Sequence, residues 1–208
     1  MGLYWKYETW IRQRLSDIDS IFGATGPCYC IRRSLTKPIP PDILLDDVYL
    51  PLGAFFQGYR LVVEPRAVAF DYPTSLDSEF KRKVRTLAGN YQILSPYPGL
   101  LGPANRMWFH FVSYKLGRLL LPYFLILVLV ASIWLPRPYA AELLLPQAAF
   151  YGIAAIDPLI PRGWMIKRVS SPARSFVVLV FAALLAISVF FVPPRTLWKE
   201  TKVAAPHR

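Results

Sequence analysis

Hydrophobic and polar positions change their pattern near the middle of the chain. In the first half, short apolar runs alternate with charged residues. The second half holds two runs of 17 residues without any charge, 119–135 and 176–192. As a helix each would extend roughly 26 Å, close to a ~30 Å hydrocarbon core. The pattern predicts two membrane-spanning helices. A third run, 143–161, holds Gln147, Asp157 and the prolines Pro146 and Pro158, and either crosses or re-enters.

Two stretches of the first half have the spacing of amphipathic helices. Residues 3–18 place aromatic and aliphatic side chains on a helical repeat. That face either packs into the core or offers rings, Trp5 and Trp10 among them, on which a flat ligand such as a sugar could stack. Residues 77–95 combine an apolar face with a basic face made of Lys81, Arg82, Lys83 and Arg85. The basic face is solvated, lies under the membrane surface, or reaches a phosphate.

Three short runs between these helices have β-strand character: 28–33, 59–65 and 67–72. Cys28 and Cys30 alternate within the first run, and we expect them to be small buried thiols of that strand. The sequence therefore predicts a mixed α/β body in front of the membrane segments.

An acid pair, Asp46 and Asp47, precedes a further helix, which we expect over 49–57. Pro51 suits the first turn of this helix, and Gly58 suits the position just after its end. Both carboxylates would then lie just upstream of the N-terminus, where the helix dipole favours the ionised form. Capping of the helix would by itself explain such a pair.

Charge is distributed unevenly along the chain. Residues 1–115 carry 14 Lys/Arg and 10 Asp/Glu, a net of +4, whereas residues 116–208 carry 10 and 3, a net of +7. The excess follows the membrane segments, so it indicates anionic lipid headgroups and inside-facing loops rather than nucleic acid. The same rule places 1–115 and 161–175 in the cytoplasm and 136–141 outside. Three spans would leave the basic tail outside, against the rule.

The order of these features along the chain is similar to that of a known protein family. A glycine turn and a basic pair ("GATGPCYCIRR") come first, and the acid pair follows them. Gly58-Tyr59-Arg60 begins eleven positions after Asp47, and "RTLWKET" stands near the end of the chain. This order resembles the C-terminal half of the membrane-bound family 2 glycosyltransferases, the group that includes cellulose, chitin and hyaluronan synthases. The resemblance covers residues 1 to about 200.

The resemblance implies a fold and a division of the chain. Residues 1–100 would be the C-terminal portion of an α/β, GT-A-like domain, and 101–118 a linker with an interfacial helix. An α-helical membrane region with two to three transmembrane helices would follow over 119–192, and then a basic tail over 193–208.

It also implies a reaction: inverting transfer of a sugar from a nucleotide sugar to a hydroxyl acceptor. Asp47 would be the general base, and Asp46 would support it. The expected substrate-binding residues are Trp5, Trp10, Gly26, Arg82 and Arg85. The Gln-x-x-Arg-Trp motif of the processive enzymes matches 82–86 only in part, because Arg85 is kept but the tryptophan is Thr86.

The family's Asp-x-Asp metal motif has no counterpart at the expected place in this chain. Mg²⁺ or Mn²⁺ would therefore be bound outside it, by a donor-binding half acting as partner. The other expected partners are the nucleotide sugar, the hydroxyl acceptor and membrane lipids, with no nucleic acid. A different class of function is also open: a non-catalytic membrane scaffold or accessory subunit that retains part of the fold.

Overall fold

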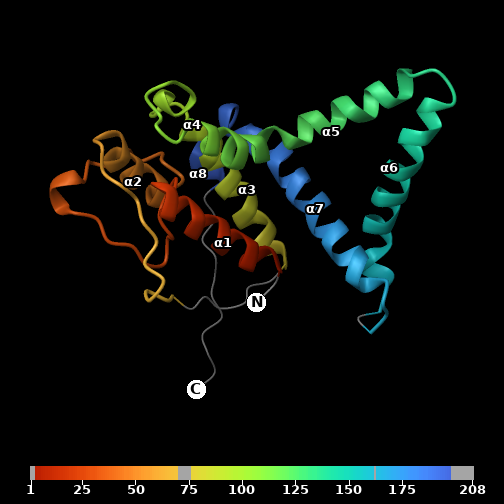
Figure 1. Cartoon of the computed structure of the whole chain (residues 1–208), viewed down its shortest axis with the longest axis horizontal. Helices are drawn as coiled ribbons and strands as arrows, with labels where there is room; N and C mark the ends of the chain where they lie inside the picture. Colours follow the sequence, from red (N-terminus) through yellow and green to blue (C-terminus); the bar gives the residue numbers. More distant parts are fainter. Residues whose placement is uncertain (1–2, 70–75, 162, 198–208) are drawn as a thin grey trace.

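The computed structural model describes residues 3–69, 76–161 and 163–197, which fold into helices joined by irregular segments. The long helices are α1 (Leu3–Ile18), α2 (Asp46–Phe56), α3 (Leu76–Gln92), α5 (Gly117–Trp134), α6 (Tyr139–Ile156) and α7 (Lys167–Ala186). The short ones are η1 (Arg33–Leu35), η2 (Pro98–Leu101), α4 (Trp108–His110), η3 (Phe111–Leu116), η4 (Asp157–Leu159), η5 (Ile187–Phe190) and α8 (Pro194–Leu197). Figure 1 shows a body built from the first four α-helices, with α5, α6 and α7 extending from it.

The expected α/β domain is wrong: the described residues contain no β-strand. The reason is visible in the run 59–65, where the amides of Leu61 and Val63 bond to the side-chain oxygens of Ser20 and Ser16, both at 2.8 Å. The Leu61 carbonyl accepts from Ile21. A strand needs a neighbouring strand for its backbone groups, and here the end of α1 takes that place.

The other two expected strands also fail. Residues 28–32 are irregular and lead into η1, and Cys28 and Cys30 are exposed free thiols rather than buried ones. The described part of 67–72 is likewise without strand structure.

α2 begins three residues earlier than expected, so the acid pair forms its first turn instead of preceding it. The N-cap residue is Leu45, which makes no side-chain capping bond. Capping therefore does not explain the acids. At the other end, Gly58 has φ +90°, its amide bonds to Phe55, and the Tyr59 amide bonds to Ala54. These two hydrogen bonds form a Schellman motif, which confirms that Gly58 ends the helix as expected.

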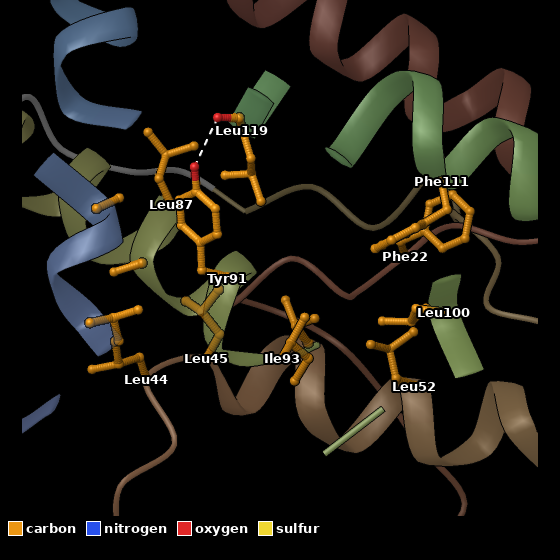
Figure 2. Close-up of a cluster of buried hydrophobic side chains, with 14 of the residues drawn as sticks. Phe22, Leu44, Leu45, Leu52, Leu87, Tyr91, Ile93, Leu100, Phe111 and Leu119 are labelled. Atoms are coloured by element: carbon orange, nitrogen blue, oxygen red, sulfur yellow. Dashed lines mark hydrogen bonds between the residues drawn. The ribbon is translucent and has the colours of Figure 1, made fainter. Parts of the chain in front are cut away.

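The core of the body joins residues from almost every element. α3 contributes Leu87, Ala88 and Tyr91, and Gly89 lets it approach closely, because a Cβ there would lie 2.4 Å from Leu45 Cγ. Figure 2 shows this cluster and the Tyr91 hydroxyl donating to the carbonyl of Leu119 in α5 at 2.8 Å. The residues that continue the cluster on the C-terminal side are Ala182, Ala183, Ala186 and Val189.

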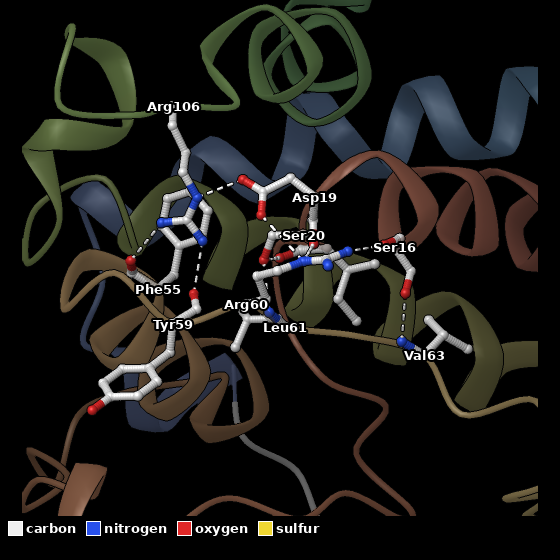
Figure 3. Close-up of polar contacts among 10 residues, drawn as sticks. Ser16, Asp19, Ser20, Phe55, Tyr59, Arg60, Leu61, Val63 and Arg106 are labelled. Carbon is white, nitrogen blue, oxygen red and sulfur yellow. Dashed lines mark hydrogen bonds and ion pairs between the residues drawn. The ribbon is translucent and has the colours of Figure 1, made fainter.

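The Gly58-Tyr59-Arg60 segment connects the end of α1 to the rest of the body through hydrogen bonds (Figure 3). Arg60 donates to the carbonyls of Asp19 and Ser16, at 2.7 and 2.8 Å, at the end of α1. Arg106 pairs with the Asp19 carboxylate and donates to the Tyr59 carbonyl at 2.7 Å. A cation at a helix C-terminus neutralises the unpaired carbonyls there, so this motif stabilises the body.

Within the part of the chain that the structure describes, three helices are long and apolar enough to cross a membrane: Trp108–Trp134, Tyr139–Leu159 and Lys167–Phe190. Figure 1 shows α5 leaving the body, α6 following it and α7 returning, so that the three form the sides of a triangle with one corner at the body. Many apolar side chains on these helices are exposed, as expected for surfaces that contact lipid.

Candidate functional site

The candidate site is centred on the carboxylate of Asp47, in the first turn of α2. A glycine turn just after α1 comes up against it. The Ala24 amide donates to the Asp47 carbonyl at 2.7 Å, and a Cβ at Gly26 would lie 3.0 Å from Asp47 Oδ2. Gly26 thus lies beside the carboxylate, and its missing side chain leaves room there; its expected role in substrate binding stays a prediction.

The glycine turn is held in place from two sides. Gly23 has φ +132°, and a Cβ there would lie 2.9 Å from Val48 Cγ2. Arg12, from α1, donates to the Gly23 carbonyl at 3.0 Å and to Thr25 Oγ1 at 3.3 Å. This close packing fixes the turn against the start of α2.

Asp47 is a half-buried carboxylate with a raised pKa. Burial is the main cause and the neighbouring Asp46 adds to it, while the positive charges of Lys115, Arg12 and Arg85 act in the opposite direction. Its Oδ1 atom is buried and has no hydrogen-bond partner among the described residues. Buried polar atoms nearly always have a partner, so this oxygen keeps the capacity to accept a hydrogen bond from a water molecule or a ligand.

A second carboxylate, that of Glu8, binds side chains of η3 and of the start of α5. Glu8, from α1, accepts from the Tyr114 hydroxyl and pairs with Arg118 at 2.9 Å. Burial alone would raise the pKa of Glu8, but Arg118 and the two hydrogen bonds lower it overall. The guanidinium of Arg118 also lies 4.9 Å from the Tyr114 ring centroid. This network fixes the segment that carries Lys115.

The structure brings together some of the expected site residues. Arg85 is half-buried, and its charge acts on Asp47, whereas Arg82, one turn earlier on α3, is exposed. Asp46 is exposed at the rim of the site. Arg82 and Asp46 therefore stay at the surface, while Arg85 lies near enough for its charge to act on the Asp47 carboxylate.

The aromatic residues expected to bind sugar lie elsewhere. Trp10 is 56% exposed and stacks on Tyr7 with 6.5 Å between ring centroids. Two positions along a helix differ by about 200°, so Trp10 projects from the face of α1 opposite to Arg12. Trp5 lies in α1, but its side chain is outside the described residues.

Sequence reasoning missed three residues of the site: Arg12, Lys115 and Tyr29. Tyr29 lies close enough to the acid pair for burial, Asp46 and Asp47 to raise its pKa. Lys115 stands in an aromatic run ahead of α5, 68 positions after Asp47, and only the fold makes them neighbours. A single cation within the run "FHFVSYKL" was the available signal.

Metal binding stays a prediction. Within 3–69, 76–161 and 163–197, no group of three or more His, Cys, Asp or Glu side chains could hold a metal ion.

Comparison with known proteins gives no match: no family model, no curated protein and no solved structure is similar to this chain. The glycosyltransferase resemblance thus rests on its sequence motifs alone.

Proposed function

We propose that this chain supplies the catalytic base, the acceptor side and the membrane anchor of a glycosyltransferase, with its body in the cytoplasm. The observation that carries the proposal is the Asp47 carboxylate, half-buried and with an unpartnered Oδ1. A general base needs a free lone pair and a pKa moved toward the working pH. Burial of Asp47 favours both.

The reaction is an inverting displacement. The acceptor hydroxyl donates to Asp47 Oδ1, its oxygen attacks the anomeric carbon of a nucleotide sugar, and the proton moves to the carboxylate. The bond from the anomeric carbon to the phosphate oxygen breaks, and the nucleoside diphosphate leaves with both electrons. A unit outside residues 1–208 binds the nucleotide and the metal.

The surrounding cations fit this role. The charges of Lys115, Arg12 and Arg85 favour the ionised form of Asp47 and oppose the rise in its pKa that burial causes. The same positive field would favour the diphosphate that leaves. Opposed effects of this kind, burial against nearby charge, are typical of acid–base sites.

The test is a comparison of Asp47→Asn with Asp46→Asn. The full chain is assembled in membranes with its donor-binding partner and given a panel of uridine and guanosine diphosphate sugars. The readout is acceptor-dependent release of the nucleoside diphosphate. We expect Asp47→Asn to lower turnover at least about 100-fold, because general bases contribute 10²–10⁴-fold. Asp46→Asn should cost less, since its side chain is exposed.

Two outcomes contradict the proposal. If Asp47→Asn keeps more than about a tenth of the turnover, the carboxylate is not the base. If the unaltered assembly transfers no sugar from any donor of the panel, the chain is better described as a scaffold or accessory subunit. Membrane content of each variant, measured by immunoblot, controls for loss of protein.

A further inference from the structure

The start of α5 and the end of α7 meet at one residue of the body, Tyr91. Its hydroxyl donates to the Leu119 carbonyl at 2.8 Å, and its ring packs edge-on against Phe190 with 5.9 Å between centroids. The chain therefore leaves the body at α5 and returns to it at the end of α7. If α5, α6 and α7 all crossed a membrane, these two points would lie on opposite sides. Their contact means that the number of crossings between them is even.

Of the three apolar helices, α7 is the one that packs extensively on α3. α3 runs alongside its second half and η5, which continues it: Phe80 stacks on Phe181 at 6.4 Å, and Tyr91 packs on Phe190 of η5. The other face of α3 carries Lys81, Arg82 and Lys83, which hydrocarbon does not tolerate. The stretch 181–190 is thus at the membrane boundary or outside it.

What remains of α7 is too short and too charged to span. Residues 167–180 would extend about 21 Å, less than the ~30 Å hydrocarbon core. Three cations, Lys167, Arg168 and Arg174, lie within the first eight of these residues. By contrast α5 and α6 have 18 residues each, about 27 Å, and match each other in length.

We propose that α5 and α6 form a hairpin that crosses the membrane twice, and that α7 lies along the membrane surface on the side of the body. Its partner is a lipid surface with anionic headgroups. This placement does not depend on the proposed sugar transfer.

The faces of α7 fit such a position. Ala182, Ala183 and Ala186 are buried under α3, while Phe181 and Leu185 are 54% and 42% exposed and would enter the near leaflet. Lys167, Arg168 and Arg174 would lie at the level of the headgroups. Charge also favours this arrangement: the body, the basic stretch 161–175 and the basic tail all come to one side, which the positive-inside rule makes the cytoplasm. Three spans would leave the basic tail on the other side.

The test is cysteine accessibility in sealed membrane vesicles of known orientation, using a membrane-impermeant maleimide. Cys28 and Cys30 are exposed, so both are first changed to serine and single cysteines are then introduced. Cys28 restored alone reports on the body, and Thr196→Cys on the segment after η5. Pro136→Cys reports on the α5–α6 turn, and Gly163→Cys on the α6–α7 turn. At Gly163 a Cβ meets no atom within 4 Å, so the substitution fits.

We expect Cys28, Gly163→Cys and Thr196→Cys to label from one side and Pro136→Cys only from the other. Labelling of Thr196→Cys from the side opposite to Cys28 would overturn the even number of crossings. Labelling of Gly163→Cys together with Pro136→Cys would mean that α7 crosses instead of α6, and would overturn its surface position. Complete labelling after detergent treatment shows that each variant is present and reactive.

Discussion

Two carboxylates, that of half-buried Asp47 in the body and that of buried Asp157 at the α6–α7 turn, differ in how many hydrogen bonds and ion pairs their oxygens make. Asp157 accepts from Ser170 Oγ at 2.6 Å and pairs with Lys167 at 3.0 Å and Arg174 at 3.4 Å. Its backbone carbonyl accepts from Lys167 as well, at 2.6 Å. Asp47 has an Oδ1 atom that is buried and without a hydrogen-bond partner among the described residues.

The difference separates a structural acid from a candidate reactive one. Among the described residues, the donors to the Asp157 carboxylate all belong to α7, so this carboxylate ties the end of α6 to the start of the next long helix. Satisfied polar networks of this kind rigidify a fold. Asp47 is held in place through its backbone and its helix, and keeps hydrogen-bonding capacity for a ligand. An unsatisfied buried group costs stability and is retained where function needs it.

The largest effect that this comparison predicts is on stability, at Asp157. Asp157→Ala removes the acceptor for Ser170, Lys167 and Arg174 and leaves a buried hydroxyl and two cations without their carboxylate. We expect the melting temperature of the detergent-solubilised chain to fall by several degrees, measured by thermal unfolding. Sugar transfer per folded molecule should be unchanged.

The matched control is Asp46→Ala, which removes an exposed acid of α2 and should leave the melting temperature nearly unchanged. An equal loss in both variants would show that the Asp157 cluster contributes no more than an exposed charge does.

The sequence predicted the elements with strong periodicity and failed where partners decide the structure. The helices over 3–18 and 77–95 are confirmed by α1 and α3, and Gly58 ends α2 as expected. Alternation in 59–65 suggested a strand, but side chains of α1 take the backbone bonds. Periodicity describes one segment, whereas strand formation depends on a second one.

The same limit applies to the two carboxylates. Asp47 was found by the order of motifs, but neither its open oxygen nor the proximity of Lys115 can be read from the chain. Asp157 looked like an interruption of an apolar run. Its partners lie 10 to 17 positions later, on a helix whose direction only the fold sets.

A smaller effect, on turnover, follows from the room left at Gly26. Gly26→Ala would place a Cβ 3.0 Å from Asp47 Oδ2, so the carboxylate or the turn must shift by a few tenths of an ångström. Catalysis depends steeply on such positions, and we expect turnover to fall about tenfold with little change in melting temperature. Gly152→Ala in α6 is the control, because a Cβ there meets no atom within 4 Å. Unchanged turnover in Gly26→Ala would mean that the space beside Asp47 is not used.

The smallest effect is on the pH dependence of stability. An acid held by ion pairs makes the folded chain more stable as the pH rises, whereas Asp47 should make it less stable. The pKa of Asp47 in the folded chain is raised, mainly by burial, above its unfolded value near 3.9. Between these two pKa values the folded chain therefore binds more protons than the unfolded chain. Its stability falls as the pH rises through that range, and the loss persists at neutral pH.

Asp47→Asn removes this titration, whereas the surrounding fold stays the same. The melting temperature of the variant relative to the unaltered chain should therefore be higher at pH 7 than at pH 3.5, where Asp47 is largely protonated in both the folded and the unfolded chain. Thermal unfolding at the two pH values measures this difference, and Asp46→Asn controls for the loss of one negative charge in the first turn of α2. The same difference at both pH values would show that the Asp47 carboxylate is as well accommodated when ionised as when neutral. It would then resemble Asp157, and the contrast between the reactive and the structural acid would be lost.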